Sequence, residues 1–240
     1  MKKMISTSLL ILNFTLFSSC LPSHQKKNSK ASFPQTEINQ NEIIQSDGSN
    51  VQGKYSAEIW PVNYNLHLKQ IGMIEANRDN DNFSVSVKLN YGPKETLVRQ
   101  ALFTGRRCPN INDDLNKDAY IDIQEAKYAI GKITIPFDGD LSSQDAGQNE
   151  YPTVDSKGKM NYFAVTSFSL MFEDLKNIDE NLFDEIIKIG EDQGITLPGR
   201  IVLLQGIPKK VVLPETVASE ENTDKYETLP VGCAVLWKTK

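Results

Sequence analysis

The chain has 240 residues, with 31 acidic and 26 basic side chains and a formal net charge of −5. This balance argues against a nucleic-acid-binding protein, which would present a basic stripe to the phosphate backbone. After residue 20 the sequence contains no apolar run long enough to cross a bilayer, and what remains is the size of one domain.

The N-terminal segment predicts an export signal. Two lysines precede an apolar stretch from Met4 to Phe17, which is too short to span a membrane. The segment ends in LFSSC, which resembles a bacterial lipobox, although Phe17 stands where leucine is usual. We therefore predict a signal peptide over residues 1–19 and lipidation of Cys20, by acyl chains such as palmitate, with Leu21 favouring the outer membrane. The alternative is an ordinary cleaved signal peptide with an incidental cysteine.

Residues 20–53 predict a disordered tether after the lipidated cysteine. They are rich in Ser, Asn, Gln and Lys and contain few large apolar groups. Such a segment cannot bury enough surface to offset the entropy cost of ordering it. Residues 54–240 then form a single globular domain.

The domain predicts mainly β structure. Alternation of apolar and polar residues predicts a strand over 62–71 and a hairpin over 72–90 that turns at RDNDN. Further strands are predicted over 96–104 and 133–137, and short apolar runs predict strands over 201–204 and 231–237. Helical spacing predicts short helices over 123–131, 167–175 and 181–190. We expect an α+β fold: an antiparallel β-sandwich or barrel-like domain with short helical insertions.

The three cysteines carry information about the compartment. Lipidation would use Cys20 and leave Cys108 and Cys233 in an oxidising envelope, where a remaining pair favours a disulfide. The alternative is two buried free thiols that pack as small hydrophobes.

One motif carries specific chemistry. Residues 114–125 read DLNKDAYIDIQE and match the twelve-residue EF-hand calcium loop. The predicted ligands are the side chains or main-chain carbonyls at its alternating positions: Asp114, Asn116, Asp118, Tyr120 (carbonyl only), Asp122 and Glu125. Calcium prefers six to eight oxygen ligands, which this spacing supplies, and four carboxylates this close would repel one another without a cation.

The loop departs from the EF-hand at its sixth position and at its flanks. Ala119 replaces the usual glycine, at a cost of roughly 1 kcal/mol for positive φ. Gly105 and Pro109 upstream exclude a regular entering helix, so we predict an EF-type loop on another fold that holds structure in place. The alternative is an acidic surface loop in which Asp114 or Asp118 favours a helix start.

Several patches of sequence resemble known proteins. The segments GRRCPNINDDLNKDAYID, KITIPFDGDLSSQDAG, RIVLLQGIPKKVVLPETVAS and LPVGCAVLW resemble exported lipoproteins of predatory bacteria, and are broadly similar to CHRD-like and Cu/Zn superoxide dismutase-like (SOD-like) β-sandwiches. The resemblance implies an H-x-H pair before the cysteine, but the matching stretch here starts at Gln100 and has no histidine. The chain's only histidines are His24 and His67, too few for a dismutase-type copper site.

These observations predict a lipid-anchored envelope protein that binds one structural Ca²⁺ and acts as a non-catalytic binding or structural module. Its protein or envelope-polymer partner is not specified by the sequence. One alternative is an envelope enzyme whose carboxylates, including Asp138 and Asp140, perform acid–base chemistry. The same two residues could instead hold a second cation, although a turn after the strand is favoured there. Another is a degenerate SOD-like protein that has lost its metal histidines.

Overall fold

A computed structural model describes residues 52–141, 150–167, 170 and 197–239. The predicted signal peptide, Cys20, nearly all of the predicted tether and the helix predicted over 181–190 lie outside these residues. So does most of the helix predicted over 167–175, whose first residue ends a strand. In the part of the chain that is described, no helix is long and apolar enough to cross a membrane.

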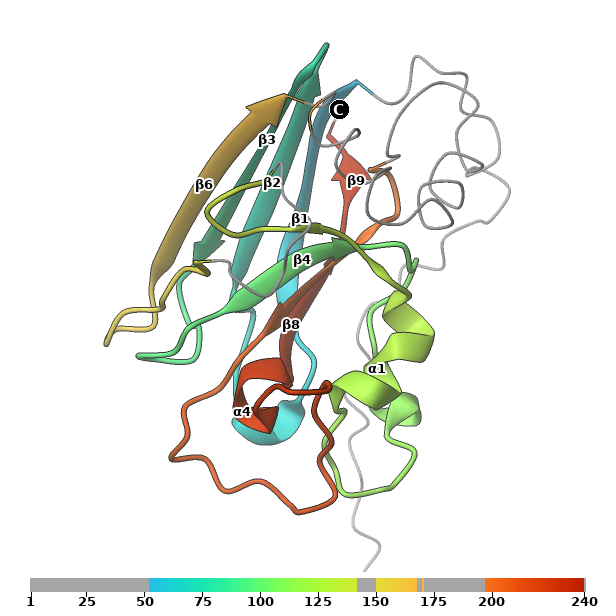
Figure 1. Ribbon diagram of the computed structural model, residues 1–240, viewed down its shortest axis with the longest axis vertical. Helices are drawn as coiled ribbons and strands as arrows, with labels where there is room; N and C mark the ends of the chain where they lie inside the picture. Colours follow the sequence, from blue (N-terminus) through green and yellow to red (C-terminus); the bar gives the residue numbers. More distant parts are fainter. Residues whose placement is uncertain (1–51, 142–149, 168–169, 171–196, 240) are drawn as a thin grey trace, which may run out of the picture. The chain divides into compact units, whose positions relative to one another are not determined.

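The described residues form one antiparallel sheet with few short helices, which confirms the predicted fold class (Figure 1). The strands are β1 (Gly53–Pro61), β2 (Gly72–Asp79), β3 (Asn82–Leu89), β4 (Arg99–Phe103), β5 (Ile133–Pro136), β6 (Met160–Ser167), β7 (Ile201–Gln205), β8 (Pro230–Val235) and β9 (Trp237–Lys238). The helices are α1 (Ile123–Ile130), α4 (Lys225–Thr228) and the 3₁₀ turns η3 (Tyr64–Leu66) and η4 (Ile111–Asp113).

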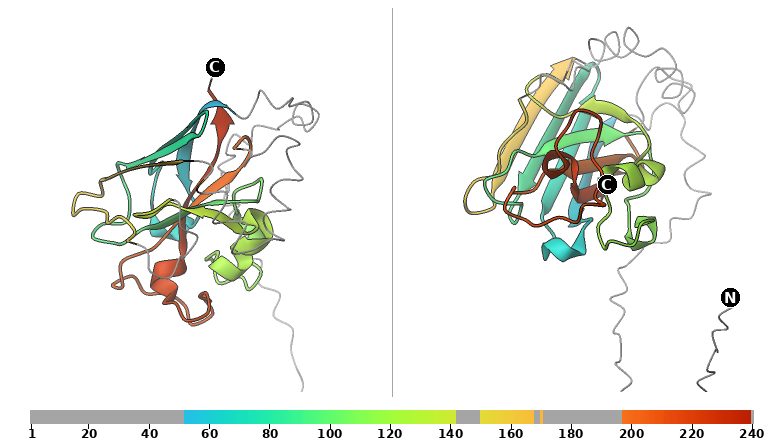
Figure 2. Two further views of the ribbon diagram at one scale, coloured as in Figure 1. Left: turned by 45° about the horizontal axis from the view of Figure 1, so that its top comes forward. Right: turned by 60° about the horizontal axis from the view of Figure 1, so that its bottom comes forward.

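The sheet runs in the order β5-β4-β7-β8-β1-β2-β3-β6, and β9 also pairs with β1. β1 joins the two halves, because its residues from Gly53 to Ile59 pair with β2 while Trp60 and Pro61 pair with β8. The result is a half-barrel: β4 and β8 run obliquely in front of β1 (Figure 1), and the right-hand view of Figure 2 shows the same crossing.

Two apolar clusters fill the fold. The larger lies inside the half-barrel and takes alternate residues of the strands, such as Phe83, Val85 and Val87 of β3. The smaller lies between α1 and the other face of β4, β7 and β8, and includes Ala126 and Ile130 of the helix. β4 and β7 are therefore buried on both faces, which explains their near-continuous apolar sequences.

The hairpin predicted over 72–90 is confirmed as β2 and β3, which pair from Gly72 opposite Leu89 to Asp79 opposite Asn82. The strand predicted over 62–71 is wrong. Pro61 ends β1, and the chain then turns through η3 to His67, whose φ is +53°. His67 is exposed in this turn, not half-buried on a strand.

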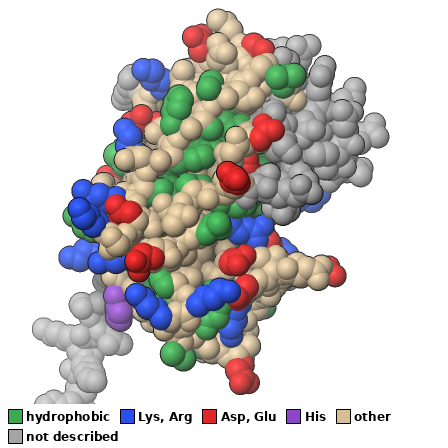
Figure 3. Space-filling model, turned by 60° about the vertical axis from the view of Figure 1, so that its left-hand side comes forward, with side chains coloured by type: hydrophobic (Ala, Val, Ile, Leu, Met, Phe, Trp, Pro, Cys, Tyr) green, Lys and Arg blue, Asp and Glu red, His purple; other side chains and the backbone are tan. Residues whose placement is uncertain are grey.

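The outer side of β6 is less polar than a typical edge strand. Phe163 is 69% exposed and Val165 is 60% exposed. Figure 3 brings the β6 side of the domain forward and shows hydrophobic side chains scattered among uncharged surface, with many of the charged groups in the lower half.

Candidate metal site

The segment that leads into the loop 114–125 is held at several points. The disulfide between Cys108 and Cys233 joins this segment to β8, with a Cα–Cα distance of 5.8 Å, and confirms the predicted pairing. The two terminal guanidinium nitrogens of Arg107, Nη1 and Nη2, each donate a hydrogen bond of 2.7 Å to the carboxylate of Asp113. This pairing is the main reason that the pKa of Asp113 is lowered. Because Asn110 also caps η4, the backbone that enters the loop is fixed on several sides.

The first half of the loop curls around its own side chains. Asp114 Oδ2 accepts a hydrogen bond from the N–H of Ala119 (3.0 Å). Asn116 Oδ1 accepts from the N–H of Asp118 (2.9 Å), and Asp118 Oδ1 accepts from the N–H of Tyr120 (2.8 Å). These bonds join residues two to five positions apart and curl the backbone of the loop.

Two residues of the loop have left-handed backbone. The φ of Lys117 is +61° and the φ of Ala119 is +70°. The positive φ expected at the sixth position is therefore present, although the residue is alanine. The sharp turn that calcium loops require at this place is made at the cost of some backbone strain.

The second half closes on the first. The helix predicted over 123–131 is α1. The side chain of Asp122 caps it by accepting hydrogen bonds from the N–H groups of Gln124 and Glu125. The side chain of Glu125 reaches back across the loop: Oε1 accepts from the N–H groups of Leu115 (2.8 Å) and Asn116 (3.1 Å). The helix start is therefore capped by the ninth loop residue, and not by Asp114 or Asp118.

Asn63 holds the loop to the body of the domain. Its Oδ1 accepts from the N–H of Ile121 (2.7 Å), and its Nδ2 donates to the carbonyls of Ile121 (3.0 Å) and Pro230 (2.8 Å). The side chain is 2% exposed, so these bonds form away from solvent. The amide thus satisfies both main-chain groups of Ile121, as a neighbouring strand would. Asn65 adds a bond from Nδ2 to the carbonyl of Ala119 (2.8 Å).

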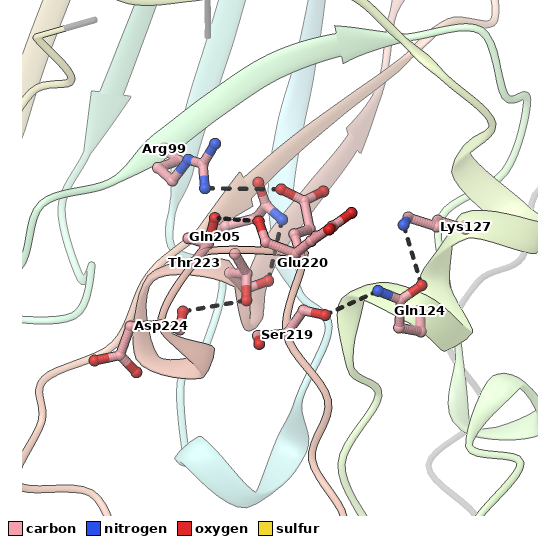
Figure 4. Close-up of polar contacts among 10 residues, drawn as sticks. Arg99, Gln124, Lys127, Gln205, Ser219, Glu220, Thr223 and Asp224 are labelled. Carbon is pink, nitrogen blue, oxygen red and sulfur yellow. Dashed lines mark hydrogen bonds and ion pairs between the residues drawn. The ribbon is translucent and has the colours of Figure 1, made fainter. Parts of the chain in front are cut away.

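The loop also fastens a distant segment, residues 214–220, that leads toward α4. The hydroxyl of Thr216 donates to Asp118 Oδ2 (2.6 Å), and the N–H of Ala218 donates to Asp122 Oδ2 (2.8 Å). Figure 4 shows the continuation of this contact, where Gln124 donates to the carbonyl of Ser219 (2.8 Å). The next residue, Glu220, forms an ion pair with Arg99 of β4 at 3.7 Å (Figure 4).

The donor set suits a hard cation. The side-chain atoms that accept hydrogen bonds within the loop are all oxygens, the ligand type that calcium and magnesium prefer over the softer metals. A carboxylate has about four lone-pair sites, and Glu125 uses three of them, the third for the N–H of Asp122. Asp114 Oδ1 is buried and has no hydrogen-bond partner among the residues that the structure describes. A buried anionic oxygen of this kind is costly unless a positive charge lies against it.

The carboxylates do not form a closed cage. In the described ranges, no group of three or more His, Cys, Asp and Glu side chains is arranged to hold a metal ion. Their oxygens face N–H donors, and the predicted set also includes the amide of Asn116 and the carbonyl of Tyr120. The structure thus places all six predicted ligand residues in one curled loop: Asp114, Asn116, Asp118, Tyr120, Asp122 and Glu125.

The other described candidate residues are arranged differently. Asp138 Oδ1 accepts from the N–H of Asp140 (2.8 Å), which is the geometry of a turn after β5. Gln100 and Leu102, in the stretch that matches the region of the H-x-H pair, are 1% and 0% exposed within the sheet. His67 lies on an exposed turn. The residues that sequence reasoning missed are Asn63 and the segment from Thr216 to Ser219, whose contacts with the loop are all long-range.

Comparison with known proteins gives only structural likenesses. No protein-family model matches the chain, and neither does any curated protein. A variant of an SOD-like protein from Bacillus subtilis has a TM-score of 0.40 at 9% identity, covering 75% of this chain and 95% of that one. The SOD-like protein itself has a TM-score of 0.37 at 10% identity, covering 76% and 97%. Cu/Zn superoxide dismutase from Brucella abortus has 0.35 at 11% identity, covering 76% and 98%.

SOD-like proteins are therefore among the solved structures that this fold matches, as the sequence resemblance implied. At these identities, and with TM-scores below 0.5, the likenesses say nothing about the activity of this chain. They do not test the resemblance to exported lipoproteins.

Proposed function

We propose that this chain is a lipid-anchored protein of the bacterial cell envelope whose loop 114–125 binds one structural Ca²⁺ and thereby fixes the segment 214–220 to the domain. The proposed module is non-catalytic. The observation that carries the proposal is the buried Asp114 Oδ1, which lies in a loop curled by its own oxygen-bearing side chains and has no hydrogen-bond partner in the described part of the chain.

Calcium should act on the distant segment through shared atoms. Asp118 and Asp122 are both predicted ligands, and their second oxygens accept hydrogen bonds from Thr216 and Ala218. A bound cation would fix these carboxylates and so strengthen the hold on the segment. The role of the ion is then structural, because it would hold the segment 214–220 against the loop 114–125.

Calorimetry on the full-length chain tests the site. Wild type should bind one Ca²⁺ with a Kd on the order of 10⁻⁴ M, as extracellular calcium modules do. Asp114→Asn should abolish the heat, because it keeps an oxygen for the N–H of Ala119 but removes the charge. The matched control is Asp140→Asn, an exposed acidic residue in the turn after β5, which should leave binding unchanged. Equal heats for wild type and Asp114→Asn would remove the site.

Hydrogen exchange tests separately whether calcium fixes the segment 214–220 to the loop. Calcium should slow exchange of the Ala218 amide, since that N–H donates to Asp122. The same protection should be missing in Asp114→Asn. Binding of calcium without any change at residues 214–220 would keep the ion site and refute its effect on the segment.

The anchor is proposed from the signal sequence. Mass spectrometry of the protein purified from envelopes should find an N-terminal peptide that begins at Cys20 and carries acyl chains. An unmodified N-terminus beyond residue 20 would overturn this part of the proposal and leave the calcium site untouched.

A further inference from the structure

The outer face of the sheet carries an ordered row of side chains. In the strand register Ser56 of β1 lies opposite Glu75 of β2, Glu75 lies opposite Ser86 of β3, and Ser86 lies opposite Phe163 of β6. Directly paired residues point to the same side of a sheet, so these four side chains form one line across four strands. The neighbouring residues of each strand, such as Tyr55 and Val85, point into the core.

A second row lies beside the first. Lys54 is opposite Asn77, and Asn77 is opposite Ser84. Together with Thr239, the two rows line a hollow of about 270 Å³. The cause is a difference in side-chain length: serines occupy the floor, while Phe163 and Lys54 are much longer. Phe163 is 69% exposed and forms an apolar wall on the β6 side, the side that Figure 3 brings forward.

The side chains that line this groove indicate which class of ligand it fits. Its hydroxyl and amide groups can both donate and accept hydrogen bonds. Lys54 and Glu75 carry opposite charges, so the groove has no net charge to attract a strongly anionic or cationic ligand. Phe163 offers a flat apolar ring next to these polar groups. A ligand that complements all three features is neutral, has many hydroxyls and has one apolar face.

We propose that this groove binds a neutral oligosaccharide, with the apolar face of one sugar ring against Phe163 and its hydroxyls on the serine floor. The volume leaves room for about one or two sugar rings, slightly below the usual range for small-molecule sites. The groove is open along the sheet, so a longer chain can continue beyond it. This proposal does not depend on calcium, because the groove and the loop 114–125 share no residue.

Tryptophan emission gives a direct readout. Trp237 of β9 lies opposite Ser56 in the register and is 37% exposed, and the chain has only two tryptophans. The full-length chain is titrated with three neutral probes, cellohexaose, maltohexaose and chitohexaose, and with hexagalacturonate as the anionic comparison. At least one neutral probe should give a saturable change in emission and a matching heat by calorimetry.

Two variants and one control locate the binding. Phe163→Ala should raise the Kd about tenfold, in line with the contribution of an aromatic contact. Ser86→Tyr should abolish binding by filling the floor. Val212→Ala is the control, because Val212 is an 88% exposed valine that does not line the groove and lies on none of its four strands. It should bind as wild type does.

Three results would overturn the proposal. The first is no saturation by any neutral probe up to about 10 mM, a limit that still detects millimolar binding. The second is equal weakening by Phe163→Ala and Val212→Ala. The third is preference for the anionic hexasaccharide over all three neutral ones.

Discussion

Replacing Asn63 tests whether one buried amide holds the loop to the sheet. Asn63→Ala removes three hydrogen bonds and leaves buried main-chain groups of Ile121 and Pro230 without their partner. Each bond is worth roughly 1 kcal/mol net, and unsatisfied buried groups add to the loss, so the free energy of unfolding should fall by about 3–5 kcal/mol. Urea unfolding followed by circular dichroism measures this, and the slope with denaturant should stay unchanged.

Two further variants make this test specific. Asn63→Asp has nearly the same volume and keeps an acceptor for the N–H of Ile121, but it places an oxygen where two carbonyls need a donor. It should therefore be about as harmful as alanine. Asn65→Ala removes one exposed bond to Ala119 and should cost less than about 1 kcal/mol. If Asn63→Ala costs no more than Asn65→Ala, the amide is not the anchor.

Three other changes have outcomes fixed by the structure. The double variant Cys108→Ser, Cys233→Ser opens a loop with a sequence separation of 125 residues. It should lower the free energy of unfolding by about 5 kcal/mol in the chain-entropy model, and a loss under about 1 kcal/mol in thermal unfolding would contradict this. Ala119→Gly relieves a φ of +70° and should add about 0.5–1 kcal/mol, whereas a lower urea midpoint would count against strain at this position. The Arg107 guanidinium lowers the pKa of Asp113, so the stability from this pair is fully present above the ordinary value of 3.8 and is lost as the pH falls through the lowered folded value. Asp113→Asn should flatten that acid limb in urea midpoints measured between about pH 2 and 6, and an unchanged profile would show that the pair does not produce it.

The hairpin of β2 and β3 was predicted because the two faces of its strands differ clearly. β2 and β3 alternate between core and solvent, and their pattern is visible in the residue types. β6 was missed because its outward residues Phe163 and Val165 are apolar while its inward neighbours are only half-buried, so the alternation is lost. The false strand over 62–71 has an alternating pattern, but Asn63 bonds to a residue 58 positions away and the chain turns there. Such a long-range contact leaves no mark in the local sequence.

The contacts of the candidate metal site are also of two kinds: local bonds, which the sequence reflects, and long-range contacts, which it does not. The bonds that curl the loop join residues two to five positions apart, as from Asp114 to Ala119, and the spacing of oxygen-bearing residues reflects them. The contact of Asp118 with Thr216 spans 98 positions, and nothing in either segment announces it. The groove on the outer face depends on strand register, which the positions of Ser56, Ser86 and Phe163 along the chain do not reveal without the pairing of four strands.

The way Asn63 serves Ile121 has a consequence for how the protein would sense its surroundings. The sequence predicts a single EF-type loop, and both main-chain groups of its Ile121 bond to a side chain, Asn63. A single loop without a twin has no neighbour to help it fill, so occupancy would rise gradually, over about an 80-fold range of free calcium from one tenth to nine tenths. Such a domain would remain steadily loaded wherever the ion is abundant, and would make a poor trigger for brief pulses.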